Sequence, residues 1–241
     1  MKSRDTAEAQ LTCALVSNRH WHWRLADHLN VRTGCRFVLI SDPEELVAAK
    51  LVSINPRFVF FPHWSHRIDA SIFKQFECVI FHMTDLPYGR GGSPLQNLIV
   101  RGISETKISA LRCVEEMDAG PIYLKKPLSL HGSAEEIYLR AAGMIEDMIV
   151  EILNKQPAPV PQEGEPTIFK RRKPEQSNLA GIATLEGAFD LIRMLDADGY
   201  PPAFLEIGPF KLEFTRASRK TDEVVSDVRI TLANPAEKDK K

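Results

Sequence analysis

Two titratable residues stand where an α/β enzyme would place acid–base groups. His82 directly follows the apolar run 78–81, and Asp118 lies in a turn between two further predicted strands. Pockets of open α/β sheets form beyond the carboxyl ends of the strands, so a histidine there can exchange protons with a substrate near neutral pH. A nearby carboxylate would orient the imidazole and stabilise its charged form. Either residue alone is more often a structural group bonded to nearby backbone.

The elements that would carry these residues follow from short apolar runs rich in β-branched and aromatic residues. Such runs predict buried parallel strands at 11–16, 35–40, 57–61 and 78–81. Segments 20–30 and 42–53 suit helices, the second opening on Asp42 and Pro43. The alternation of strand and helix predicts an α/β fold with a Rossmann-like, doubly wound, mostly parallel sheet.

Sequence patterns in the second half of the chain predict where this domain ends and a small appendage begins. Strands are expected at 106–114 and 122–128, and a helix at 133–154, opened by a capping box of Ser133 and Glu136. The expected domains are a disordered N-terminus (1–9), a catalytic domain (10–155), a Pro-rich linker (156–166), a C-terminal α+β subdomain (167–233) and a disordered tail (234–241). Within the subdomain we expect a helix at 184–195 and strands at 203–207, 210–214 and 224–232.

Composition narrows the classes of function. The 241 residues carry 31 Lys and Arg against 32 Asp and Glu, a formal charge of −1, which disfavours general nucleic-acid binding. No apolar stretch approaches the roughly 18 residues of a membrane span, and the polar N-terminus does not resemble a signal peptide. The four cysteines, Cys13, Cys35, Cys78 and Cys113, are widely spaced and predict reduced thiols. We expect a cytoplasmic protein without membrane partners.

An ordered series of motifs connects the two titratable residues. FHMTDLPYGRGGSPLQ occupies 81–96, and EEMDAGPI follows at 115–122. The series resembles the folate-dependent formyltransferases, the superfamily of glycinamide ribonucleotide transformylase, methionyl-tRNA formyltransferase and the nucleotide-sugar N-formyltransferases. Their hallmarks are an Asn-x-His running into S-L-L-P and R-G-x-x-P, and a later D-x-G. His82 and Asp118 fall on the family His and Asp, and Leu86, Pro87, Arg90, Gly91 and Pro94 on the loop.

Finer strings resemble one subgroup of that superfamily. FPHWS at 61–65 and HMTDLP at 82–87 are similar to enzymes that formylate amino sugars on the pseudaminic acid route, and RRKP at 171–174 resembles the segment after their catalytic domain. The resemblance implies N10-formyltetrahydrofolate as donor, without a metal, and a nucleotide-linked amino sugar as acceptor, in particular a UDP-4-amino sugar. It makes His82 the general acid and base and Asp118 the residue that orients it.

The resemblance also implies binding residues around this pair. Those expected to contact the folate, partly through backbone, are Phe61, His63, Trp64, Met83, Leu86, Pro87, Arg112, Cys113, Val114 and Glu116. Those expected to contact the acceptor are Thr84, Tyr88, Arg90 and Gly91. The aromatic run 60–64 fits plain core packing as well as a pterin slot.

One position departs from the family pattern. The family Asn would stand two residues before His82, where this chain has Ile80. In the family that amide helps to hold the formyl oxygen as it gains charge, a role commonly worth about 10²- to 10³-fold per donor. The candidates to replace it are a protonated His82, Thr84, Ser65 and His63.

Other features favour structural explanations. The glycine spacing at 89–92 does not fit a dinucleotide fingerprint. The basic run 170–173 is typically a solvated surface, with a nucleotide diphosphate contact as the alternative. The patch 20–23, His-Trp-His-Trp, lacks a third metal ligand at a familiar spacing and favours packing, with Trp21 or Trp23 as alternative contacts for a base.

Three further functions stay open beside the amino-sugar enzyme. A methionyl-tRNA formyltransferase is similar in its catalytic domain, but its larger, basic C-terminal domain is not matched by the short region after the linker. A formyltetrahydrofolate hydrolase would need an additional regulatory domain. A non-catalytic folate-binding protein of this fold would explain Ile80, but not the retention of His82 with Asp118. We expect no nucleic-acid partner and allow a homodimer.

Overall fold

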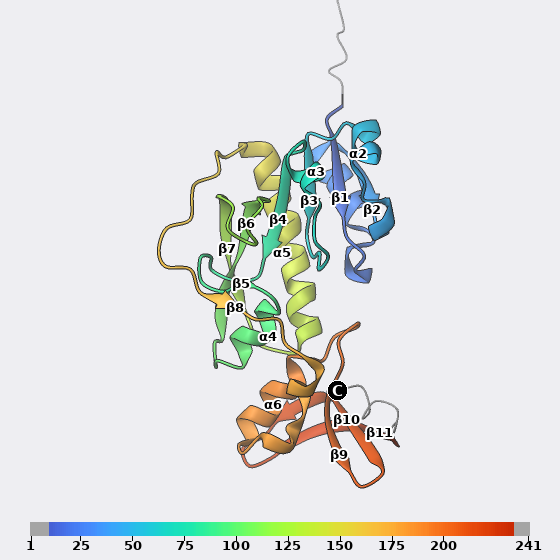
Figure 1. Ribbon diagram of the computed structural model, residues 1–241, viewed down its shortest axis with the longest axis vertical. Coiled ribbons are helices and arrows are strands. Elements are labelled where there is room, and N and C mark those ends of the chain that lie inside the picture. Colours follow the sequence, from blue (N-terminus) through green and yellow to red (C-terminus); the bar gives the residue numbers. More distant parts are fainter. Residues whose placement is uncertain (1–9, 234–241) are drawn as a thin grey trace, which may run out of the picture. The chain divides into compact units, whose positions relative to one another are not determined.

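The computed structural model describes residues 10–233 (Figure 1). The disorder expected for 1–9 and 234–241 lies outside the described residues. The chain forms two compact units, each built from several stretches. Within the described residues, unit 1 comprises 10–90, 107–127 and 141–167, and unit 2 comprises 91–106, 128–140 and 168–233.

A six-stranded sheet in the order β2-β1-β3-β4-β6-β7 forms the centre of the fold. Its strands are β1 (Thr12–Val16), β2 (Arg36–Ile40), β3 (Phe58–Phe61), β4 (Cys78–His82), β6 (Glu105–Arg112) and β7 (Ile122–Ser129). The first four pair in parallel, whereas β4 and β6 pair antiparallel. The predicted α/β Rossmann-like fold is confirmed, with a mixed rather than purely parallel sheet.

Helices accompany the strands as the alternation predicts (Figure 1). They are α1 (Leu25–Thr33), α2 (Ala48–Ile54), α3 (Ala70–Phe73), α4 (Pro94–Ile99), α5 (Ala134–Lys155) and α6 (Leu185–Arg193). At the start of α5 the backbone N–H of Ser133 donates to Glu136, and the N–H of Glu136 donates to the Ser133 hydroxyl. This reciprocal pair satisfies two donors that an uncapped helix leaves open.

Two of the predicted helices are broken near their starts. Segment 20–30 begins as a 3-10 turn at His20–His22, and α1 starts only at Leu25. The reason is local, because the His22 side chain is buried and bonds to the Ser17 hydroxyl at 2.8 Å. In segment 42–53 Asp42 caps a 3-10 turn at Pro43–Glu45, after which the extended backbone of Val47 separates it from α2.

The core of unit 1 lies between the first strands and the helices beside them. Its fully buried side chains include Ala14 and Val16 of β1, Val59 and Phe61 of β3, and Cys78 of β4. Burial of such side chains is the main favourable term in folding, about 25 cal/mol per Å² of apolar surface. The carboxyl end of β4, and with it His82, is therefore placed by a well-packed sheet.

Unit 2 contains an antiparallel three-stranded sheet in the order β11-β10-β9, together with α6. The strands are β9 (Ala203–Ile207), β10 (Phe210–Arg219) and β11 (Val224–Leu232). β10 is longer than the predicted 210–214, because it pairs with β11 along its length apart from an irregularity between Thr215 and Ser218. Two short strands, β5 (Arg90–Gly91) and β8 (Ile168–Phe169), form a further two-stranded sheet that the sequence did not predict.

Among residues 10–233, no helix combines the length and the apolar character needed to cross a membrane. Over the same residues, His, Cys, Asp and Glu side chains form no group of three or more that could hold a metal ion.

Candidate active site

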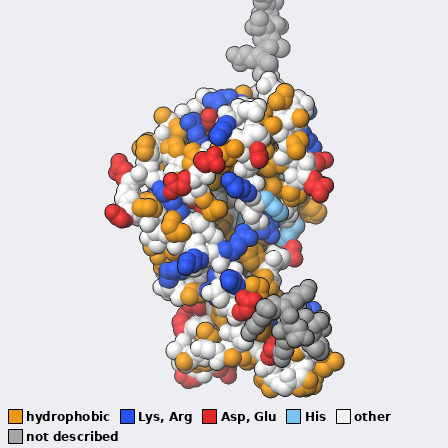
Figure 2. Space-filling model, in the orientation of Figure 1, with side chains coloured by type: hydrophobic (Ala, Val, Ile, Leu, Met, Phe, Trp, Pro, Cys, Tyr) orange, Lys and Arg blue, Asp and Glu red, His pale blue; other side chains and the backbone are white. Residues whose placement is uncertain are grey.

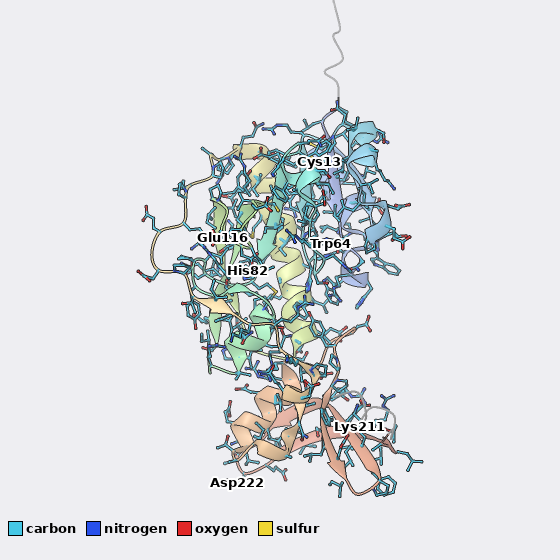
Figure 3. All side chains as sticks on the ribbon, in the orientation of Figure 1. Cys13, Trp64, His82, Glu116, Lys211 and Asp222 are labelled. Atoms are coloured by element: carbon cyan, nitrogen blue, oxygen red, sulfur yellow. The ribbon has the colours of Figure 1, made fainter. Side chains whose placement is uncertain are left out.

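His82 ends β4 as a buried side chain with one nitrogen committed to the backbone. Figure 3 labels this side chain on the ribbon. It is 8% exposed, and its Nε2 lies 2.8 Å from the carbonyl oxygen of Gly89. A carbonyl oxygen only accepts hydrogen bonds, so Nε2 carries the hydrogen in this arrangement. The loop after β4 therefore folds back and fixes the orientation of the imidazole. Nδ1 is left as the nitrogen that faces Asp118.

Nδ1 of His82 faces a carboxylate. It lies 3.6 Å from Oδ2 of Asp118, and the two side chains are only 10% and 11% exposed. This separation is that of an ion pair rather than a short hydrogen bond. With Nε2–H given to Gly89, Nδ1 is the ring nitrogen at which a proton can be exchanged beside the carboxylate. The pair thus suits a histidine that gains and loses a proton.

The turn that carries Asp118 has a demanding backbone. Asp118 has a φ of 53°, in the left-handed region that costs non-glycine residues about 1–2 kcal/mol. Two residues on, a Cβ at Gly120 would lie 1.8 Å from the carbonyl oxygen of Arg112, so only glycine fits. The D-x-G spacing thus has a steric basis in this chain.

A network of polar side chains surrounds that turn. The amide nitrogen of Gln162 donates to the carbonyl oxygens of Asp118 and Gly120, both at 2.8 Å. The amide oxygen of Gln162 accepts from Nε and Nη2 of Arg90 at 3.1 and 2.9 Å. Nη1 of Arg90 donates to Glu116 at 3.1 Å. Arg90 and Glu116, expected to contact ligands, here contact each other.

The loop after β4 is held by buried hydroxyls and by lysines. The Ser109 hydroxyl donates to the carbonyl oxygen of Thr84 at 2.7 Å, and the Thr84 hydroxyl donates to that of Gly89 at 3.3 Å. Asp85 pairs with Lys125 at 2.6 Å and with Lys107 at 2.9 Å. Burial tends to raise the pKa of Asp85, but the two lysines outweigh it and hold the pKa below its ordinary value.

The expected folate-binding side chains on β3, on β4 and in the adjoining loops differ in their accessibility. Phe61 is 1% exposed and belongs to the core of unit 1, so its ring packs rather than lines a surface. Met83 and Leu86 are also buried, whereas Pro87 is half-buried. His63 is half-buried, and burial, with Arg19 nearby, lowers its pKa to about 3, so the ring stays neutral. Trp64 is half-buried, and its Nε1 has no hydrogen-bond partner among the described residues.

The expected contacts beyond β6 lie along the chain toward Asp118. Arg112 directs its guanidinium to Glu77 and Tyr123, away from a ligand role for its side chain. Cys113 and Val114 are half-buried. Burial, with the Asp118 charge adding, raises the pKa of the Cys113 thiol to about 11, so it stays protonated.

Of the expected acceptor-binding residues, only Tyr88 presents an exposed side chain. Thr84 is fully buried, and the Arg90 side chain is 12% exposed. A Cβ at Gly91 would lie 2.4 Å from the Phe169 carbonyl oxygen, so this glycine is required for close packing of backbone. The structure therefore brings together His82, Asp118, Thr84, Arg90 and Glu116, and assigns several of them partners within the protein.

Sequence reasoning missed two parts of this site. Gln162 lies in the Pro-rich segment 156–166, which composition marks as a linker, although a polar amide among prolines was a signal available in the sequence. The Gly89 carbonyl was missed because backbone acceptors leave no mark on residue type. Ile80 pairs in register with Phe61 and Leu111 and offers no donor on the face of β4 that it shares with His82.

The chain is similar to proteins of known families. A model of the methionyl-tRNA formyltransferase C-terminal domain matches residues 174–231. The methionyl-tRNA formyltransferase of Thermodesulfovibrio yellowstonii is 26% identical over 152 residues, which make up 60% of this chain and 49% of the relative. The chain spans 49% to 60% of the length of this relative and of the methionyl-tRNA formyltransferases of Lactobacillus gasseri and Lactobacillus johnsonii.

Solved structures extend the comparison to the whole fold. A methionyl-tRNA formyltransferase from Clostridium thermocellum is 46% identical with a TM-score of 0.90, covering 92% of this chain and 100% of that one. The formyltransferase PseJ from Anoxybacillus kamchatkensis, solved with UDP-4,6-dideoxy-4-formamido-L-AltNAc and tetrahydrofolate, has a TM-score of 0.54 at 16% identity, over 66% of this chain and 85% of that one. The second likeness shows the fold alone. On the first, this chain belongs to the formyltransferase family that includes methionyl-tRNA formyltransferase.

Proposed function

We propose that this protein transfers a formyl group from N10-formyltetrahydrofolate to a primary amine. The observation that carries the proposal is the buried pair of His82 and Asp118, whose orientation the Gly89 carbonyl fixes. Such a pair moves protons at neutral pH, and formyl transfer to an amine requires that a proton leave the nucleophile and another reach the leaving nitrogen. The tetrahydrofolate bound to PseJ supports the identity of the donor.

The residues present fit a folate in one respect and depart from the family in another. The buried Nε1 of Trp64 lacks a partner among the described residues, and a buried donor in that state costs about 1–3 kcal/mol unless a ligand or water accepts from it. In contrast, Ile80 supplies no amide, and the Thr84 hydroxyl donates to Gly89. When bound, the folate supplies a formyl carbon open to attack. His82 would accept and return the proton, and Asp118 would stabilise the imidazolium.

The named relatives change which acceptor substrate ranks first. Sequence reasoning placed a nucleotide-linked amino sugar first and expected no nucleic acid. The relatives named for methionyl-tRNA support the amine of methionyl-tRNA better, so it becomes the leading acceptor. Lys and Arg side chains recur along the middle of the face shown in Figure 2, and they suit the phosphates of either acceptor.

A nucleotide-linked amino sugar remains the second candidate because of one specific charge pattern. Residues 174–231, the region matched by the C-terminal domain model, carry 6 Lys and Arg against 10 Asp and Glu, a net charge of −4. Proteins bind tRNA largely through phosphate contacts from cationic side chains, and an acidic region opposes them. The pseudaminic acid route and a homodimer stay predictions.

Release of tetrahydrofolate from N10-formyltetrahydrofolate tests the proposal. The full chain is assayed with methionyl-tRNA, with UDP- and dTDP-linked 3-amino and 4-amino sugars, and without acceptor. Release that depends on methionyl-tRNA supports the leading acceptor, and release that depends on one sugar supports the second. Release without acceptor indicates a hydrolase. Folate binding without release for any acceptor contradicts formyl transfer and favours the non-catalytic function.

A further inference from the structure

Gln162 makes four hydrogen bonds with two loops of the candidate site, although it lies in the Pro-rich segment. Its Nε2 donates to Asp118 and Gly120, and its Oε1 accepts two bonds from Arg90. The bonds use both N–H groups and both lone pairs of the side-chain amide. Glutamate at this position could not donate to the two carbonyls, and lysine could not accept from Arg90, so the site demands an amide of this length.

The segment that carries Gln162 is fixed on both sides of it. The backbone of Val160 exchanges two hydrogen bonds with Ile122, at 2.7 and 2.9 Å. On the other side, the N–H of Thr167 donates to the Pro87 carbonyl at 3.2 Å, and the Thr167 carbonyl accepts from Gly89 and Arg90. Gln162 is therefore held against the site by backbone bonds that do not depend on its own side chain.

The Asp118 turn needs outside support. Asp118 has a left-handed φ of 53°, which is unfavourable for a non-glycine residue. Gln162 donates to the carbonyl oxygens of Asp118 and Gly120, which lie on either side of Ala119. Arg90 lies on the loop that also carries Gly89. Its guanidinium donates both to the amide oxygen of Gln162 and, at 3.1 Å, to a carboxylate oxygen of Glu116. One side chain thus connects the loop that orients His82 with the turn that carries Asp118.

We propose that Gln162 is a positioning residue that sets the distance between Asp118 and His82. The inference rests on the proposed function of that pair, and it assigns no contact with substrate to Gln162. Catalytic groups lose on the order of 100-fold in rate when they are misplaced by about 1 Å. Loss of the amide is therefore expected to lower kcat about 10- to 100-fold while KM for the folate changes less than about 3-fold.

The first test does not require turnover. NMR of histidine-labelled full-length protein measures the titration midpoint of His82, identified by its loss in His82→Gln. Asp118→Asn removes the charge that faces Nδ1, so the change of midpoint in this variant measures the coupling of the pair. Gln162→Met has similar length and no charge, so it should move the midpoint toward that of Asp118→Asn. The neighbouring Glu163 is exposed, and about 0.15 M salt screens its charge. Glu163→Gln should therefore leave the His82 midpoint within about 0.3 pH units of the wild-type value.

The second test separates the two halves of the amide. Gln162→Glu keeps an acceptor for Arg90 but cannot donate to the carbonyls of Asp118 and Gly120, so its kcat should fall as far as that of Gln162→Met. Because it is nearly isosteric, it also serves if Gln162→Met does not fold. Wild-type kcat in Gln162→Glu would overturn the assignment of the carbonyl bonds.

The outcomes distinguish this inference from the proposed function. If Asp118→Asn moves the His82 midpoint and Gln162→Met leaves it at the wild-type value, the positioning role is wrong whether or not any amine is formylated. If both move it and no acceptor is formylated, the positioning role stands and formyl transfer fails. If Asp118→Asn itself has no effect, the pair is not coupled and the inference fails with it.

Discussion

His82 and Gly89 are joined by a hydrogen bond of 2.8 Å that decides which imidazole nitrogen faces Asp118. The acceptor is a backbone carbonyl, so the bond does not depend on the side chain at position 89, and it leaves Nδ1 as the nitrogen that faces the carboxylate. Proton transfer in the site therefore depends on a loop conformation as much as on two residue types.

We expect His82→Gln and Asp118→Asn each to reduce kcat for formyl transfer about 10²- to 10⁴-fold, the usual worth of a general acid–base group. Tetrahydrofolate release with the active acceptor measures the loss, and thermal unfolding shows whether the fold persists. Because the two residues act as one unit, the double variant should lose little more than the worse single variant. Near wild-type turnover in both single variants would falsify the proposed roles.

Ile80→Asn restores the amide that the family carries at this position. Ile80 shares a face of β4 with His82, so the new side chain would add a donor beside the imidazole. We expect kcat to rise about 10-fold or more, within the range known for oxyanion donors, at a stability cost of about 1–3 kcal/mol for the half-buried amide. Ile80→Val is the control and should leave kcat unchanged. An unchanged kcat in Ile80→Asn would mean that another group already holds the formyl oxygen.

Stability should fall as the pH is lowered below about 6.5. Burial, with positive charge on Arg19 and His20 adding, lowers the pKa of His22 from 6.5 to about 3. The folded protein keeps this ring neutral while the unfolded chain takes up a proton, so stability present above pH 6.5 is lost as the pH falls toward 3. At pH 5 the loss due to His22 is about 2 kcal/mol.

Urea unfolding at pH 7.5 and pH 5 measures that loss. His22→Gln cannot titrate, so its free energy of unfolding should change with pH by about 2 kcal/mol less than that of the wild type. The control is His131→Gln, which replaces an exposed histidine and should keep the wild-type dependence. Equal pH dependence in His22→Gln and wild type would show that His22 is not the responsible group.

Two glycine substitutions should have opposite effects. Gly120→Ala brings a methyl group onto the Arg112 carbonyl and should destabilise the protein by about 1–3 kcal/mol, while also lowering kcat through the Asp118 turn. Gly143 lies inside α5, and an added Cβ meets nothing within 4 Å. Gly143→Ala should therefore stabilise by about 0.5–1 kcal/mol and leave kcat unchanged. Thermal unfolding and the release assay measure both effects, and a stabilised Gly120→Ala would contradict the steric argument.

The strands could be predicted because their burial leaves a mark on residue type. Runs such as 58–61 and 78–81 are apolar where both faces of the sheet are covered, and the observed β3 and β4 follow them closely. The position of His82 followed from the end of such a run. The breaks in the segments 20–30 and 42–53 were not predictable in the same way, since they depend on single contacts such as that between His22 and Ser17.

The environment of the site was harder to predict than its two titratable residues. An aromatic side chain at a strand end suits a ligand slot and a core equally, and Phe61 lies in the core. Arginine in a glycine-rich loop suggests a ligand contact, yet Arg90 binds Gln162 and Glu116. Such assignments depend on contacts between segments far apart in sequence, which the pattern of one segment does not encode.

The anchoring of the Pro-rich segment bears on where this protein can be shortened. A chain ending at Lys155 would keep the six strands of the main sheet together with His82 and Asp118. It would lose the carbonyl of Thr167, which accepts from Gly89 and Arg90, and with it the strand-like support beneath the loop that orients the imidazole. A fragment cut at the composition boundary would thus retain His82 and Asp118 but lose both Gln162 and the backbone bonds that hold the loop, so we expect the smallest piece of this chain with an intact site to reach at least Thr167.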